Sequence, residues 1–200
     1  MRIDSGRSSL MVFADFIPVA PISADTIAAY QGRVPAEVSA AWEQYGAGFL
    51  GDGYFRFVDP ARADAMLGGG RPVPDDAVVL FATAMADLVV WWQDMYLVAK
   101  TRLGEIHAAS IPFAELVALM DPDPEARAVV WDWEPYPLAM QRLGVPAFEQ
   151  CLMHVPILAM GGRGDPATMD LGSLWVHVGL MLHMAGPPKF THMLPLPSGQ

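Results

Sequence analysis

The chain has 200 residues, of which 53% are hydrophobic and only 17% charged, and its formal net charge is −10. This length suits one domain with a sizeable core, and so few charged residues predict either deep burial or an apolar surface kept for a partner. The negative charge argues against direct binding of nucleic acid, because phosphates would repel it, and favours basic protein partners.

The N-terminal residues resemble a signal peptide only faintly. Arg2 and Arg7 precede an apolar stretch, but Asp15 and Pro18 interrupt it. The sequence contains no run of about 18 consecutive apolar residues, so we expect no membrane span. The single cysteine, Cys151, allows no internal disulfide, and we expect it to be a small buried hydrophobe. These features predict a cytoplasmic protein.

Capping residues mark two helices in the first third of the chain. Ser23 can cap a helix that runs to Tyr30, and Asp59 can cap a second helix that Gly68 ends. Residues 68–76, rich in glycine and proline, form the clearest loop in the sequence.

Residues 46–51 read GAGFLG and match the G-x-G-x-x-G pattern of dinucleotide-binding loops. That pattern has meaning only where a strand precedes it and a helix follows. Here residues 34–45 have helical periodicity, and the aromatic run at 53–58 predicts a strand after the glycines. We therefore interpret Gly46 as a helix cap that leads into a turn.

Four strand-like runs lie between residues 78 and 109: VVLFAT, LVVWW, MYLVAKT and EIHAA. The breaks between them are too short for the crossover that parallel neighbours need, so they predict a β-meander. Trp91 and Trp92 should point to opposite faces, one into the core and the other covered by a C-terminal helix or exposed.

The rest of the chain is expected to be mostly helical, with three short helices between Ser110 and Gly144. Residues 151–162 are ambiguous between a strand and a buried helix. Residues 171–185 have apolar side chains all round, which predicts a helix buried on both sides. The proline-rich tail from Pro187 is expected to be mobile. The predicted fold class is α+β, an antiparallel β-meander sheet packed with N-terminal and C-terminal helices.

The sequence lacks the spacings that metal sites and nucleophile elbows need. His177 and His183 are six residues apart and fall on different helix faces, unlike the i, i+4 pair of a zinc site. A G-x-S-x-G elbow is also missing. We therefore expect no metal, no cofactor and no enzymatic activity.

The run DPDPEARAVVWDWEP, at residues 121–135, has five acidic residues against one arginine. Tryptophans alternating with acids suit a surface for a basic partner, since aromatic rings give contact area and acids give steering. The alternative is that Trp131 is core, Trp133 is half-buried and the acids are simply solvated. The residues predicted to contact a partner are Asp121, Asp123, Glu125, Trp131, Asp132, Trp133, Glu134 and, in the GGRGD turn, Arg163 and Asp165.

Three stretches together resemble the GAD-like domain followed by the C-terminal region of type VI secretion immunity proteins. They are VPAEVSAAWEQYGAGFLGDGYFRFVDP, FATAMADLVVWWQDMYLVAKTRLGEIHAA and FEQCLMHVPILAMGGRGDPATMDLGSLWVHVGLML. Ala86 departs from the glycine usual in the family. The resemblance divides the chain into residues 1–19 outside the pattern, a GAD-like α+β region at 20–120, a helical C-terminal region at 121–186 packed on it as one unit, and a tail at 187–200.

The resemblance implies a non-enzymatic immunity protein. Such a protein binds a cognate type VI secretion toxin, often a DNase, and occludes or distorts its active site inside the producing cell. Two alternatives remain from the residues alone. One is a small-ligand-binding or enzymatic domain with a pocket between the meander and the C-terminal helix. The other is a structural subunit whose apolar surface is a homo-oligomer interface.

Overall fold

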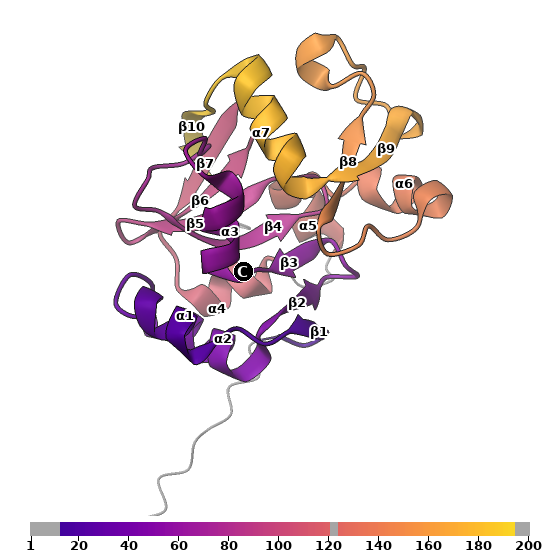
Figure 1. Cartoon of the computed structure of the whole chain (residues 1–200). Coiled ribbons are helices and arrows are strands. Elements are labelled where there is room, and N and C mark those ends of the chain that lie inside the picture. The colour runs from indigo at the N-terminus through magenta and orange to yellow at the C-terminus, as the bar shows by residue number, and fades with distance from the viewer. Residues whose placement is uncertain (1–12, 121–123, 195–200) are drawn as a thin grey trace, which may run out of the picture.

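The computed structural model describes residues 13–120 and 124–194, and an eight-stranded sheet forms its centre (Figure 1). Consecutive strands from β1 to β7 pair antiparallel, and β10 lies parallel to β7 at the edge. The α+β class and the β-meander are therefore confirmed. The strands are β1 (Ile17–Ala20), β2 (Ala47–Leu50), β3 (Phe55–Phe57), β4 (Val78–Thr83), β5 (Leu88–Trp92), β6 (Met95–Lys100), β7 (Glu105–Ala109) and β10 (Lys189–Met193).

The turns of the meander explain why its four predicted strands pair in sequence order. Gln93 and Asp94, between β5 and β6, have φ of 46° and 61°, the conformation of a two-residue turn whose twist suits a hairpin. Between β4 and β5, the Thr83 hydroxyl accepts the backbone N–H groups of Met85 and Asp87 at 3.2 and 3.1 Å. Such tight turns leave antiparallel neighbours as the only possible arrangement.

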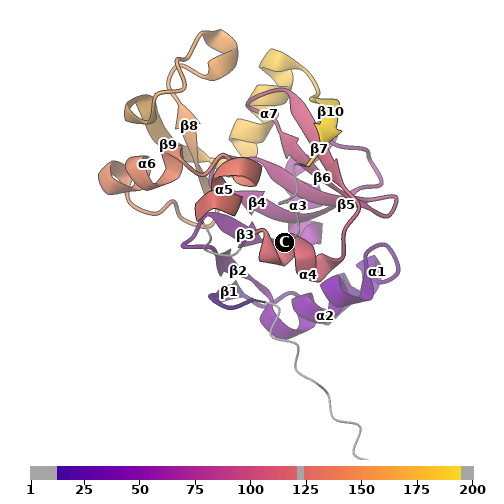
Figure 2. The same cartoon turned by 180° about the vertical axis from the view of Figure 1, so that it is seen from behind.

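Helices cover both faces of the sheet. In Figure 1, α3 and α7 lie in front of it, and in Figure 2, α4 and α5 lie in front of the opposite face. A first hydrophobic core joins the sheet to α2, α4, α5 and α6, and a second joins it to α3 and α7. The helices are α1 (Ala24–Tyr30), α2 (Ala36–Tyr45), α3 (Pro60–Leu67), α4 (Phe113–Ala118), α5 (Pro124–Trp131), α6 (Pro135–Leu143) and α7 (Leu174–Ala185).

Aromatic rings fill the first core. The ring centroids of Phe57 and Phe81, on neighbouring strands, are 4.9 Å apart, and Trp42 of α2 stacks on Phe57 at 6.1 Å. Phe13, before β1, meets Phe57 edge-on at 5.3 Å. The segment at the N-terminal end of the described chain is therefore part of the folded unit.

Most helix boundaries follow the residues that the sequence marked. The Ser23 hydroxyl accepts the N–H of Thr26, and the Asp59 carboxylate accepts the N–H of Ala61. Gly46, with φ of 68°, ends α2, which confirms it as a cap. The expected turn after it is wrong, because the next four residues form β2 and pair with β1.

For the C-terminal residues, the structure resolves one ambiguous prediction and corrects two others. The ambiguous segment is strand β8 (Gln150–His154) followed by the short 3-10 helix η1 (Leu158–Met160). Strand β9 (Met169–Ser173) pairs with β8, so the predicted helix begins three residues later than its pattern suggested. The described part of the predicted mobile tail is instead ordered as β10, and Leu194 beyond it is buried.

Candidate functional site

The predicted partner-binding residues fall into three groups. Asp121 and Asp123 lie outside the described residues, and only the backbone of Glu125 is described, within α5. A second group makes contacts inside the molecule, and a third group is exposed.

The two tryptophans of the acidic segment are buried or half-buried in the core. Trp131 is 1% exposed, and its indole N–H donates to the Leu119 carbonyl at 2.6 Å. Its prediction as a contact residue is therefore corrected, because a partner cannot reach it. Trp133 is half-buried: the Arg127 guanidinium lies over its ring at 4.3 Å, and the Tyr54 ring is 4.9 Å away.

Asp132 forms ion pairs inside the molecule. Its Oδ2 accepts the Lys100 ammonium at 3.0 Å and the Arg102 guanidinium at 2.6 Å, and the same nitrogen of Arg102 reaches Asp87 at 3.2 Å. The side chain of Asp87 is only 2% exposed. Two cations and two carboxylates thus balance one another, so the charge of Asp132 is largely neutralised within the fold, and its role as a partner contact stays a prediction.

The pKa values in this charge cluster follow burial. Burial raises the pKa of Asp87, and the nearby Arg102 and Lys100 offset only part of that effect. Burial also opposes ionisation of Asp132, but there the same two cations together lower the pKa below its usual value. Asp87 is therefore the buried acid that depends most on its arginine partner.

The remaining predicted residues, Glu134, Arg163 and Asp165, are exposed. Asp165 caps the 3-10 helix η2 (Pro166–Thr168) by accepting the N–H of Ala167 at 2.8 Å. A hollow of about 290 Å³ lies between η2 and α6, and Leu138, Arg142 and Asp165 are among its lining residues. The fold thus places the GGRGD turn beside α6, which begins directly after Glu134.

One face of α7 is uncovered, contrary to the prediction that both sides are buried. Val176, Leu180 and Met184, each one turn apart, are 68%, 40% and 45% exposed. We call these three residues the α7 stripe. The opposite face packs into the second core through Leu174, Trp175, Val178 and Met181. Periodicity could not separate the two faces, because both are apolar. No helix in the described part of the chain is long and apolar enough to cross a membrane.

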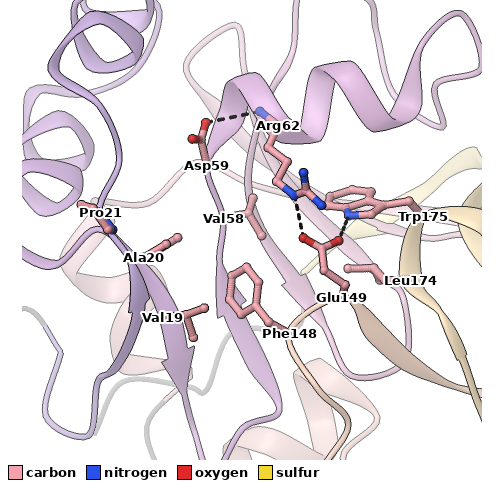
Figure 3. Close-up of a pocket in the computed structure, with 11 residues that line it drawn as sticks. Val19, Ala20, Pro21, Val58, Asp59, Arg62, Phe148, Glu149, Leu174 and Trp175 are labelled. Carbon is pink, nitrogen blue, oxygen red and sulfur yellow. Dashed lines mark hydrogen bonds and ion pairs between the residues drawn. The ribbon is translucent and has the colours of Figure 1, made fainter.

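A cavity of about 260 Å³ lies where β1, the first turn of α3, the segment before β8 and the start of α7 meet (Figure 3). The residues come from parts of the sequence more than a hundred positions apart, so no local pattern predicted the site. It lies beside the C-terminal helix, but none of its lining residues belongs to the meander at residues 78–109, so it is not the predicted pocket between the meander and that helix. Its apolar walls are Val19, Ala20, Pro21, Ala47, Val58, Phe148, Leu174 and Trp175.

Three charged side chains line this cavity, and in Figure 3 Arg62 and Glu149 lie together beside Trp175, whereas Asp59 lies apart from them. One oxygen of the Glu149 carboxylate accepts the Arg62 Nε–H, and the other accepts the Trp175 indole N–H, both at 2.7 Å. Asp59 also lines the cavity, and one of its oxygens caps α3. The hydrogen bond to Glu149 raises the pKa of Arg62.

Three of the five histidines, and the cysteine, are buried. Within residues 13–120 and 124–194, no three His, Cys, Asp or Glu residues are grouped so that they could hold a metal ion. Burial lowers the pKa of His154 and His177. Burial also raises the pKa of Cys151 to about 12, which keeps it a thiol at neutral pH and confirms it as a small buried hydrophobe.

Comparisons with known proteins identify a domain and a fold. A search of curated protein sequences found no match. The structure is similar to the crystal structure of Atu4351 from Agrobacterium tumefaciens, with a TM-score of 0.68 and 20% sequence identity over 88% of each chain, which shows a shared fold. The family model of the GAD-like domain matches residues 8–103, which hold β1 to β6. This match confirms the GAD-like domain, over residues 8–103; it includes residues 8–19, which the resemblance left outside the pattern, and it ends before the predicted boundary at residue 120.

Proposed function

We propose that the chain is an immunity protein that binds a cognate type VI secretion toxin, a DNase, and neutralises it by occluding or distorting its active site. The GAD-like domain supports the first half of the sequence resemblance on which this proposal rests. The resemblance to immunity proteins lies in the C-terminal region, and the exposed side chains of that region support it.

The observation that carries the proposal is the exposed apolar surface outside the GAD-like domain. The α7 stripe covers more than two helical turns without a charged residue, and Met160 of η1, which packs near α7, is 63% exposed. Leu138 on α6 is 58% exposed. Exposed apolar surface of this kind favours a protein–protein contact, because it costs free energy to leave in water.

Charge supports a basic partner. A DNase needs a positively charged surface to bind the phosphates of its substrate. A chain of net charge −10 is attracted to such a surface. Glu134 and Asp165 are exposed in the same C-terminal region as the apolar side chains. Acids around an apolar centre accelerate association, while the centre provides affinity.

The direct experiment is purification of the tagged chain from its native organism at moderate salt, with identification of any protein that co-elutes in equal amount. We expect one basic protein whose DNA-cutting activity falls as the purified chain is added. A chain that elutes alone, or only with itself, would contradict the proposal.

Two matched variants then locate the contact. Leu180→Asp puts a charge into the α7 stripe, and Leu103→Asp does the same at a residue of nearly equal exposure, 43% against 40%, in the GAD-like domain. We expect Leu180→Asp to weaken toxin binding at least about tenfold, the effect of losing a central apolar contact, and Leu103→Asp to leave it unchanged. Equal effects of both variants would remove the α7 stripe from the interface.

A further inference from the structure

The cavity of Figure 3 combines the two properties of a ligand site, apolar walls and a few convergent polar groups. It joins the GAD-like domain, through Val58 and Arg62, to the C-terminal region, through Phe148 and Trp175. In Figure 3, Val58 and Phe148 lie between the residues of β1 and the pair formed by Glu149 and Trp175. A ligand here would touch both regions of the chain at once.

The charges at the rim do not cancel. Arg62 is the one cation among the lining residues, and Asp59 and Glu149 are two carboxylates. The Arg62 Nε–H is committed to Glu149. One oxygen of Asp59 accepts backbone N–H groups of α3, and its other oxygen has no protein donor among the described hydrogen bonds. The rim therefore carries one excess negative charge beside an apolar space.

We propose that this cavity binds an apolar group that carries a single cationic head, with the apolar part against Val58, Phe148 and Trp175 and the cation beside Glu149. An arylalkyl ammonium ion has this chemistry, and so does the side chain of an arginine or lysine from a bound protein. Burial of the apolar part releases water, and the cation neutralises the rim. An anion of the same shape would meet two carboxylates against one guanidinium, whose Nε–H already donates to Glu149.

The test uses the indole N–H of Trp175 as a reporter, because its donor atom lies in the site. Nitrogen-15 NMR of the full chain would follow that signal during titration with phenethylammonium, with 3-phenylpropanoate as the anion of similar shape, and with N-acetylarginine amide as a stand-in for a protein side chain. The indole signals of Trp92 and Trp131, which bond to Asp76 and Leu119 elsewhere, serve as internal controls.

We expect phenethylammonium to shift the Trp175 signal saturably and 3-phenylpropanoate to bind at least tenfold more weakly. Saturation by phenethylammonium alone would indicate a free amine as the natural ligand, and saturation by N-acetylarginine amide as well would indicate a protein side chain. Equal or tighter binding of the anion, or no saturable shift with either cation, would overturn the proposal.

Two pairs of variants separate the cavity from the rest of the surface. Val19→Trp fills the cavity from the exposed strand β1, and Ile17→Trp adds the same ring on that strand outside the cavity lining. Glu149→Gln removes one rim charge but keeps an oxygen for Trp175, and Glu115→Gln removes an exposed charge on α4.

We expect Val19→Trp to abolish the titration and Glu149→Gln to weaken phenethylammonium at least threefold, while both control variants bind as the parent does. Binding that survives Val19→Trp would place the ligand elsewhere and refute the site. The test requires no toxin, so a failure here leaves the immunity proposal standing, and a failure to capture a toxin leaves this proposal intact.

Discussion

Replacing Arg102 by methionine should test how much the fold depends on its buried charge cluster. Methionine keeps most of the apolar stem of arginine but removes the guanidinium that bridges Asp87 at 3.2 Å and Asp132 at 2.6 Å. Asp132 is 34% exposed, so water can replace most of what it loses. Asp87 is 2% exposed and would be left with a buried, unpaired charge.

The magnitude follows from that difference in exposure. Breaking a buried ion pair from one side costs about 3–5 kcal/mol, whereas an exposed pair is worth about 0–1 kcal/mol. We therefore expect Arg102→Met to lower the free energy of unfolding by about 3–5 kcal/mol at pH 7, nearly all of it from Asp87. A domain of ordinary stability, about 5–15 kcal/mol, would still fold.

The loss should depend on pH in a defined direction. The pKa of Asp87 is already raised by burial, and without Arg102 it rises further, so the folded variant prefers the protonated acid. A raised folded-state pKa makes ionisation destabilising at neutral pH, and the penalty disappears as pH falls below that pKa. Asp132 adds little over this range, because the stability that its lowered pKa gives the parent is lost only near and below the usual aspartate pKa of about 3.9. The difference between parent and variant should shrink from pH 7 towards pH 4.

Urea unfolding between pH 7 and pH 4 measures both the loss of unfolding free energy and its pH dependence. The proteins compared are the parent, Arg102→Met, and the double variant that adds Asp87→Asn. The double variant removes the stranded charge and should recover about 1–3 kcal/mol of the loss. A loss below about 1 kcal/mol for Arg102→Met at pH 7 would show that water reaches Asp87 and would refute the reasoning. A loss that grows as the pH falls would refute it as well.

Three further substitutions test other parts of the fold by chemical denaturation. Tyr54→Phe should cost about 1–3 kcal/mol, because it removes a buried 2.5 Å hydrogen bond to the Trp131 carbonyl, and no loss would mean that water satisfies that carbonyl. Gly48→Ala should cost about 1–3 kcal/mol, because a Cβ there meets the Ile17 carbonyl and the Phe16 ring, and a neutral result would show that β1 can move aside. Gly179→Ala, in the interior of α7 with nothing near its added methyl group, should instead stabilise by about 1 kcal/mol, and any destabilisation would contradict the exposed position.

The meander was predictable because its signals are local. Runs of β-branched and aromatic residues mark the strands, and the short breaks force antiparallel pairing. Ala86 shows why the family pattern has glycine at this position: its φ of 62° is the left-handed conformation that favours glycine. The caps at Ser23 and Asp59 were predictable for the same reason, since each bonds to a residue two or three positions away.

The edge strands and the candidate site were not predictable, because their partners are distant in sequence. Strand β10 exists because the end of the chain pairs with β7, more than eighty residues earlier, and a proline-rich tail carries no sign of that partner. Asp132 was predicted to steer a partner because its neighbours in sequence are acidic. Its neighbours in space are Lys100 and Arg102, and these decide its charge balance.

Backbone contacts attach the C-terminal region to the GAD-like domain. Arg56 of β3 is fully buried and donates to the carbonyls of Ala147 and Gln150 at 3.4 and 2.8 Å, and burial lowers its pKa to about 10, so it stays a cation at neutral pH. Leu152 of β8 donates its N–H to the Ala84 carbonyl at 2.7 Å. These attachments use main-chain groups of residues 147–152, so they do not depend on the side chains displayed beyond them. The exposed residues of α6, η1 and α7 can therefore change while the scaffold stays fixed, a separation that the proposed immunity function would need if each protein is specific for one toxin.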